Sequence, residues 1–262
     1  MGTAWDRAAE GYVREWVPRF EPYHLDLVRA LGLSGGEQVL VTSAGPGAEI
    51  VPLARAIGAK GRVRATDPSE SMVRLCRELT ARAQLETPVE VAVADGADTS
   101  GGEPWDAVVN AFGFWQLRDR VATLRAWGQS LAPHGMVGLI AWGPEEPTDP
   151  FDMLRASLRQ VEPAMASPIT GVRPDREGFE AMLGESGLTI ARHAVVRHPM
   201  TFATASAFVG AMRDSCAWRA IHEELGDERF SRVAEHFYAR VGGPAAPLRL
   251  APPATVVIAS RA

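Results

Sequence analysis

An apolar strand that leads directly into a glycine-containing turn and then a helix most constrains the fold of this chain. Residues Gln38 to Thr42 read as a buried strand, Ser43 to Gly47 as a tight turn of small residues, and a helix begins near Ala48. Glycine lets the backbone approach a ligand closely, and the free N–H groups that open a helix can bind an anion. An isolated turn of this kind is as often an ordinary connection as a ligand site, so the rest of the chain has to decide.

The alternation of apolar runs with helical patterns continues along the chain. Further strands are expected at residues 62–66, 89–94, 106–111, 136–142, 188–196 and 255–260. Helices are expected to open at Ser69, a good N-cap residue, and to run from Asp119 to Leu131. Strands that alternate with helices predict a parallel sheet, and the last two strands predict an antiparallel edge pair. The expected fold is therefore α/β with a seven-stranded, mostly parallel sheet.

Three segments lie outside this core pattern, namely residues 1–30, 143–174 and 200–245. Such segments beside a rigid scaffold commonly build lids and substrate pockets. We therefore expect one domain over residues 1–262, in which a ligand-binding core at 31–142 carries helical lid segments. The stretch from 242 to 253 is rich in Pro and Gly and reads as a loop.

Composition and net charge limit the classes of partner that this chain is expected to bind. The chain has 262 residues, of which 46% are hydrophobic and 23% charged, and its formal net charge is −5. These values suit a soluble globular protein and disfavour a nucleic-acid partner, which needs clustered Lys and Arg. We see no signal peptide, no membrane span and no disulfide framework in the two cysteines. We expect a cytoplasmic protein with a small-molecule substrate and no membrane partner, and leave a homodimer open.

Polar residues follow three successive strands of the expected sheet. Asp67 ends the second strand about twenty residues after Gly47, where a carboxylate can accept hydrogen bonds from both hydroxyls of a ribose. Asp95 ends the third strand and could accept from an adenine amine, and Asn110 to Phe112 end the fourth. Each residue alone is more often a cap or turn residue. Together they mark the edge where open α/β sheets bind ligands.

Two further segments carry a resemblance to a known family. The opening stretch WDRAAEGY, from Trp5 to Tyr12, and the turn LAPHG, from Leu131 to Gly135, resemble segments of the class I S-adenosylmethionine-dependent methyltransferases. The likeness is greatest to the ubiquinone/menaquinone-biosynthesis-like group, which methylates small molecules, and it covers roughly residues 5–142. It implies a Rossmann-like fold, S-adenosylmethionine as cofactor, S-adenosylhomocysteine as product and a methyl-transfer reaction.

The resemblance also implies a role for each matching residue. Ala44, Gly45 and Gly47 would line the methionine part of the cofactor, and Asp67 would hold the ribose. Pro68 and Met72 would lie near the adenine, and Asp95, Gly96 and Ala97 would surround its edge. Asn110 and Phe112 would lie beside the sulfonium, Tyr12 would close over the cofactor, and Ser43 and Ala111 are further cofactor-binding candidates.

The sequence departs from the family at three positions. The family usually has an acidic residue where Val41 stands, and glycine where Ser43 and His134 stand. These departures leave open a cofactor-binding protein of the same fold that has lost transfer activity or catalyses another reaction, such as a cyclisation or isomerisation. A nicotinamide dehydrogenase is disfavoured, because Ile50 occupies the place of the third glycine of G-x-G-x-x-G.

The acceptor is expected to be a small, fairly apolar metabolite, methylated on oxygen or carbon, in secondary metabolism for example. His24 and His222 are the candidate general bases, because both fall in lid segments. Four tryptophans are candidate substrate contacts, namely Trp5, Trp115, Trp142 and Trp218. Each of these side chains is, taken alone, at least as often a packing residue. No metal site is expected.

Overall fold

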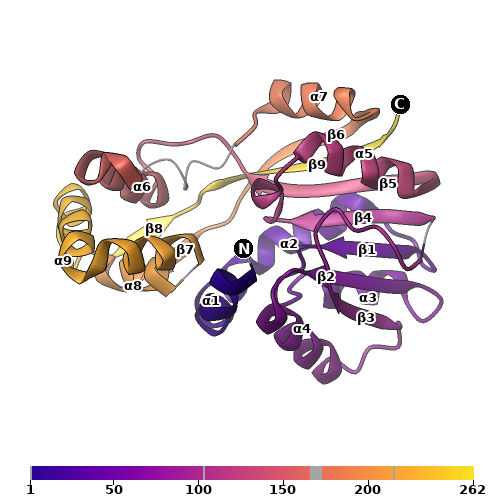
Figure 1. Ribbon diagram of the computed structural model, residues 1–262, viewed down its shortest axis with the longest axis horizontal. Coiled ribbons are helices and arrows are strands. Elements are labelled where there is room, and N and C mark those ends of the chain that lie inside the picture. The colour runs from indigo at the N-terminus through magenta and orange to yellow at the C-terminus, as the bar shows by residue number, and fades with distance from the viewer. Residues whose placement is uncertain (1, 103, 166–172, 215) are drawn as a thin grey trace.

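A seven-stranded sheet organises the computed structural model, which describes residues 2–102, 104–165, 173–214 and 216–262. The strands follow the order β3-β2-β1-β4-β5-β9-β6 (Figure 1). Their bounds are β1 Gln38–Thr42, β2 Arg62–Asp67, β3 Val89–Val93, β4 Trp105–Ala111, β5 Leu131–Trp142, β6 Leu188–Arg197 and β9 Pro253–Arg261. The first five strands pair in parallel, and β9 pairs antiparallel with both β5 and β6. The predicted fold class, a Rossmann-like sheet with antiparallel pairing at one edge, is confirmed.

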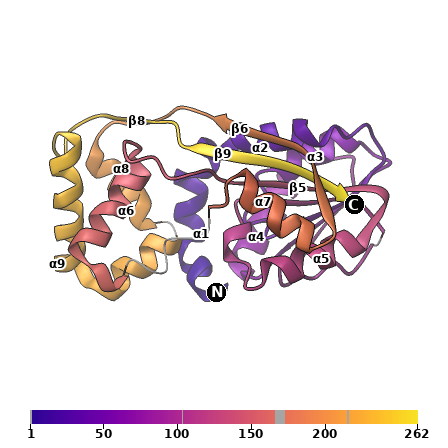
Figure 2. The same cartoon turned by 90° about the horizontal axis from the view of Figure 1, so that it is seen from above.

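Helices cover both faces of this sheet. One face carries α2 (Val17–Leu31), α3 (Ile50–Ile57) and α4 (Glu70–Arg82), and the other carries α5 (Arg120–Ser130) and α7 (Arg176–Glu185). Figure 2 shows α2 and α3 on the opposite side of the sheet from α5 and α7. Successive strand residues point to opposite faces, so Val39 and Val41 pack under the first layer and Leu40 under the second. Burial of each such side chain contributes about 1.5–3 kcal/mol to stability.

Side-chain caps fix where the helices begin. The Oγ of Ser69 accepts a hydrogen bond from the Met72 N–H at 3.2 Å, and Asp119 accepts one from the Ala122 N–H at 2.9 Å. Each cap satisfies one of the free N–H groups of a first helical turn and is worth about 1 kcal/mol. The sequence predicted both of these starts, because the capping residue type is itself the local signal.

A second group of elements, here called the cap, stands at one end of the sheet. It contains α6 (Pro150–Val161), α8 (Ala205–Asp214), α9 (Cys216–Val241), β7 (Met200–Phe202) and β8 (Leu248–Leu250). Figures 1 and 2 show helix α1 (Gly2–Glu15) between the cap and the sheet. A series of aromatic rings, Phe112, Trp142, Phe151, Phe208 and Phe237, connects the two parts, with successive centroids 4.3, 6.0, 5.3 and 5.6 Å apart. The cap therefore shares the hydrophobic core of the sheet.

Two local predictions differ from the structure. The loop expected at 242–253 contains strand β8, which pairs with β7, and each of these strands is shorter than the stretch of about four to eight residues over which alternation identifies a strand. Strand β5 begins at Leu131 rather than 136, because Leu131 already pairs with Trp105 across a bulge. Helix α9 is kinked at Gly226, where the φ of 72° is not helical. Part of the predicted segment 143–174, residues 166–172, lies outside the described residues.

None of the helices in the described part of the chain has an apolar stretch long enough to cross a bilayer.

Candidate functional site

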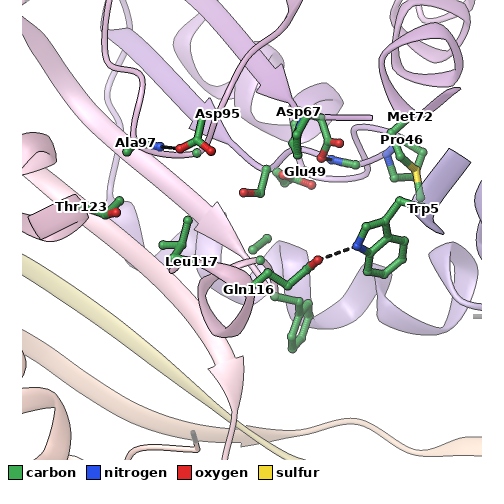
Figure 3. A pocket seen from close by; sticks show the side chains of 18 of the residues that line it. Trp5, Pro46, Glu49, Asp67, Met72, Asp95, Ala97, Gln116, Leu117 and Thr123 are labelled. Carbon is green, nitrogen blue, oxygen red and sulfur yellow. Dashed lines mark hydrogen bonds between the residues drawn. The ribbon is translucent and has the colours of Figure 1, made fainter. Parts of the chain in front are cut away.

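A cavity of about 570 Å³ opens at the carboxyl ends of the parallel strands. The connections that follow β1, β2, β3 and β4 all contribute to its wall, and helices α1 and α2 close it from the side (Figure 3). Parallel strands bring their carboxyl ends to one edge of a sheet, which is why residues far apart in sequence meet here. Most of the residues predicted to bind the cofactor line this cavity, namely Tyr12, Ser43, Ala44, Gly45, Asp67, Pro68, Met72, Asp95, Gly96, Ala97, Ala111 and Phe112.

Two residues of that prediction, Gly47 and Asn110, are not among those that line the cavity. Gly47 has a φ of +85°, and a Cβ there would lie 2.7 Å from the Cys76 Sγ, so this glycine holds α4 close to the turn. Asn110 is fully buried and donates from Nδ2 to both the carbonyl and the Oγ1 of Thr42 at 3.1 Å. It joins the ends of β4 and β1 beneath the cavity.

Ser43 stands in a backbone conformation that favours glycine. Its φ is +50°, which costs a residue with a Cβ about 1 kcal/mol or more. Its side chain also fills the space between two glycines, since a Cβ at Gly113 would lie 2.6 Å from the Ser43 Cβ, and one at Gly96 3.0 Å from its Oγ. The departure from the family at this position therefore keeps the geometry of the turn at a cost in strain.

Asp67 connects the second strand to the glycine turn. Its Oδ2 accepts a hydrogen bond from the Gly45 N–H at 2.9 Å, and its Oδ1 accepts one from the Ser69 N–H at 2.8 Å. Burial raises the pKa of this carboxyl, while the two backbone donors lower it. A carboxylate oxygen can accept more than one hydrogen bond, so Asp67 can hold the turn and still accept from ligand hydroxyls in the cavity.

Glu49 is a cavity residue that the sequence analysis missed. It precedes α3, it is only 2% exposed, and its Oε1 has no hydrogen-bond partner within the described structure. Burial, together with the nearby charge of Asp67, raises the pKa of Glu49 to about 8. The available signal was a lone acidic residue directly after the glycine turn, in an otherwise apolar helix start.

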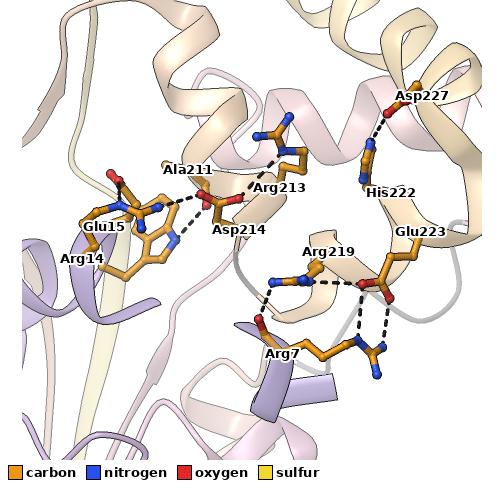
Figure 4. Close-up of polar contacts among 11 residues, drawn as sticks. Arg7, Arg14, Glu15, Ala211, Arg213, Asp214, Arg219, His222, Glu223 and Asp227 are labelled. Carbon is orange, nitrogen blue, oxygen red and sulfur yellow. Dashed lines mark hydrogen bonds and ion pairs between the residues drawn. The ribbon is translucent and has the colours of Figure 1, made fainter. Parts of the chain in front are cut away.

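The two candidate bases lie in different places. His24, on α2, lines the cavity 5.7 Å from the Phe112 ring, and its Nδ1 has no hydrogen-bond partner among the described residues. His222, on α9, instead bonds to Asp227 at 2.8 Å and packs against Phe230 in the cap (Figure 4). The structure therefore brings His24, and not His222, to the cavity.

His24 also makes stability depend on pH. Burial lowers its pKa from 6.5 to about 4, so the folded protein holds it neutral while the unfolded chain protonates it below 6.5. Its contribution is fully present above pH 6.5 and is lost as the pH falls towards 4. We expect the stability difference between the wild type and His24→Gln to shrink by about 2 kcal/mol from pH 7 to pH 5. Denaturant unfolding of both proteins at each pH measures this, and a difference that stays constant would contradict it.

The four candidate tryptophans also lie in different places, and only some of them could contact a substrate in the cavity. Trp5 lines the cavity and donates from Nε1 to the Gln116 Oε1 (Figure 3). Trp142 stacks on Phe112, and Trp218 is buried in the cap. Neither these two nor Trp115 is among the lining residues. Further lining residues outside the predicted site residues come from the segment after β4, namely Gly113, Gln116, Leu117, Arg118, Asp119, Ala122 and Thr123.

Helix α1 is attached on both sides of the cavity. Towards the core, Asp6 accepts hydrogen bonds from the Ser69 Oγ at 2.5 Å and the Ser71 N–H at 3.0 Å. Towards the cap, Arg7 pairs with Glu223 at 2.9 Å and Arg14 with Asp214 at 2.8 Å (Figure 4). These exposed ion pairs are individually weak, but together they fix the orientation of α1. Tyr12 on this helix lines the cavity, and burial beside Glu49 and Asp67 raises the pKa of its hydroxyl.

Across the described ranges, no group of three or more His, Cys, Asp or Glu side chains is arranged to hold a metal ion.

Comparison with known proteins agrees with this architecture. Residues 39–135 match the profile of a family described as "Methyltransferase domain". The fold is similar to that of a proposed methyltransferase of Bacillus halodurans, at 14% identity and a TM-score of 0.62, over 90% of this chain and 97% of that one. No curated protein sequence matches the chain significantly.

Two other solved structures show a similar fold in proteins with different activities. A SAM-dependent methyltransferase from Aquifex aeolicus is 21% identical, with a TM-score of 0.57 over 71% of this chain and 91% of that one. The [4+2]-cyclase SpnF is 15% identical, with a TM-score of 0.58 over 92% of this chain and 80% of that one.

Proposed function

We propose that the protein transfers a methyl group from S-adenosylmethionine to a small, fairly apolar metabolite, and the match of residues 39–135 to a methyltransferase domain supports this proposal. The observation that carries this proposal is the cavity, which joins carboxylates at the strand ends to an aromatic wall formed by Trp5 and Phe112. A hydroxyl or a carbon nucleophile of a secondary metabolite is the kind of acceptor that such a wall would suit.

The lining residues fit the cofactor chemically. The molecule carries a ribose diol, an adenine with donor and acceptor edges, and cationic groups. The cavity offers the carboxyl groups of Asp67 and Asp95 and a buried Glu49 oxygen without a partner. Asp67 would accept from the ribose hydroxyls, and Asp95 with the Ala97 backbone would meet the adenine edge. Pro68 and Met72 would pack on the adenine, and Ala44 and Gly45 would line the methionine part.

The bound cofactor supplies a methyl group that its positively charged sulfur has already activated. The protein has to align the acceptor with that methyl group and exclude water. Trp5 and Tyr12 on α1 would cover the ligands, and Phe112, with Trp142 stacked on it, would form a rigid wall. His24 is neutral at pH 7, because burial lowers its pKa to about 4, so its ring can accept a hydrogen bond from an acceptor hydroxyl.

A radiolabel experiment tests the transfer. Purified protein is incubated with S-adenosylmethionine labelled on the methyl carbon and with panels of small phenols, enols and hydroxylated polyketide-like compounds. We expect label in at least one panel and stoichiometric S-adenosylhomocysteine. Cofactor binding in calorimetry without label transfer to any panel would count against methyl transfer.

A second function, catalysis of a non-methylating reaction in the same cavity, is favoured by one pair of observations. The chain lacks the family's acidic residue at Val41 and its glycine at Ser43, and its fold is similar to that of a cyclase as well as to methyltransferases. The same incubations separate the two functions. A product of unchanged mass, formed while the cofactor is not consumed, would support cyclisation or isomerisation.

A further inference from the structure

Four carboxyl groups line the cavity, and three of them already have local partners. Asp67 accepts from two backbone N–H groups, Asp95 accepts from the Ala97 N–H at 2.9 Å, and Asp119 caps α5. These three side chains shape the turns in which they stand. Glu49 is the fourth, and within the described structure no donor reaches its Oε1.

A buried carboxyl oxygen without a donor is costly, typically by about 1–3 kcal/mol. Glu49 is 2% exposed, so water does not compensate it fully, and the negative charge of Asp67 opposes its ionisation. In the described part of the chain no Lys or Arg forms an ion pair with Glu49, and Arg118 is the single Lys or Arg among the described residues that line the cavity. Such a group is suited to an incoming ligand that brings both an N–H donor and a positive charge.

Glu49 lies close in sequence to Val41, where this chain lacks the acidic residue that the family usually has. Val41, where the family usually has an acidic residue, is fully buried in the apolar core under α2 and α3. Strand β1 therefore offers no carboxylate at its end. Glu49 lies on the other side of the same glycine turn and brings a carboxyl group into the same cavity.

We propose that Glu49 recognises the α-ammonium group of the cofactor's methionine part and takes over the place of the acid that Val41 lacks. The inference rests on the proposed function. An ammonium N–H donates to the Glu49 Oε1, which a sulfonium cannot do because it has no N–H. The carboxyl proton leaves to solvent, so binding converts a neutral acid and a cation into an ion pair and one free proton.

Two ligands isolate this contact in titration calorimetry. S-adenosylhomocysteine carries the ammonium, and 5′-methylthioadenosine lacks the amino-acid group altogether. For Glu49→Gln we expect the Kd of the first ligand to rise about tenfold, which corresponds to about 1.4 kcal/mol, and that of the second to stay within twofold. Asp67→Ala is the matched comparison, because loss of the ribose contact weakens both ligands. Circular dichroism and Tm confirm that each variant is folded.

The proton provides an independent readout. Wild-type protein at pH 7 is expected to release close to one proton per S-adenosylhomocysteine bound, seen as a binding enthalpy that varies with the ionisation enthalpy of the buffer, and Glu49→Gln is expected to release none. Equal weakening of both ligands, or no change in either, would overturn the role of Glu49 while leaving the cofactor site intact. Wild-type protein that binds neither ligand would overturn the proposed function and this inference together.

Discussion

Replacement of Asp67 by alanine is expected to weaken S-adenosylhomocysteine binding at least a hundredfold, which corresponds to about 2.7 kcal/mol. The substitution removes two kinds of contact that the Asp67 carboxylate makes. Its carboxylate would accept from the ribose hydroxyls, and hydrogen bonds to a charged acceptor are worth about 1.5–3 kcal/mol each. Its oxygens also hold the N–H groups of Gly45 and Ser69 at 2.9 and 2.8 Å, so the glycine turn loses its anchor to β2. Titration calorimetry measures the loss directly.

The chain contains a close control for this substitution. Asp98 also accepts from a backbone N–H two residues later, that of Ser100 at 2.9 Å, but it does not line the cavity. Asp98→Ala removes the same kind of turn contact and is expected to leave the Kd within twofold. Binding by Asp67→Ala within threefold of the wild type, in a protein of unchanged Tm, would show that the ligand is held elsewhere.

The strand-end residues could be predicted because their placement follows from topology alone. Once β1, β2, β3 and β4 are parallel, Asp67 and Asp95 have to meet at one edge, whatever the details of packing. The capping residues Ser69 and Asp119 carry their own local signal for a helix start. These features depend on short stretches of sequence and on one rule for sheets.

The remaining features depend on how distant elements pack. Trp142 ends strand β5 and could have faced the cavity, but it stacks on Phe112 and is not among the lining residues. His222 and His24 both fall in lid segments, and only the orientation of α2 and α9 decides which one reaches the cavity. Glu49 carries no motif at all. Its meaning comes from burial and from an Oε1 that no donor reaches within the described structure, and a sequence displays neither.

The glycine turn itself is expected to be sensitive at Gly47. A Cβ at this position would lie 2.7 Å from the Cys76 Sγ and 3.0 Å from the Ile50 Cδ1, in a backbone with a φ of +85°. The left-handed conformation costs about 1–2 kcal/mol, and overpacking adds about 1–3 kcal/mol. Gly47→Ala should therefore lower the free energy of unfolding by about 2–5 kcal/mol and the Tm by roughly 5–15 °C, because α4 is forced away from the turn.

Gly45→Ala is a control that distinguishes backbone strain from steric overlap of the added Cβ. Its φ is +53°, yet a Cβ there would meet nothing within 4 Å, so Gly45→Ala should show only the left-handed cost of about 1–2 kcal/mol. Cys76→Ala removes the atom that Gly47→Ala would strike, so the double variant should recover at least about 1 kcal/mol relative to the sum of the single changes. Thermal unfolding of the four variants measures these differences. If Gly45→Ala and Gly47→Ala lower the free energy of unfolding equally, with no coupling to Cys76→Ala, backbone strain alone accounts for both effects. In that case, contact with α4 does not fix the shape of the turn.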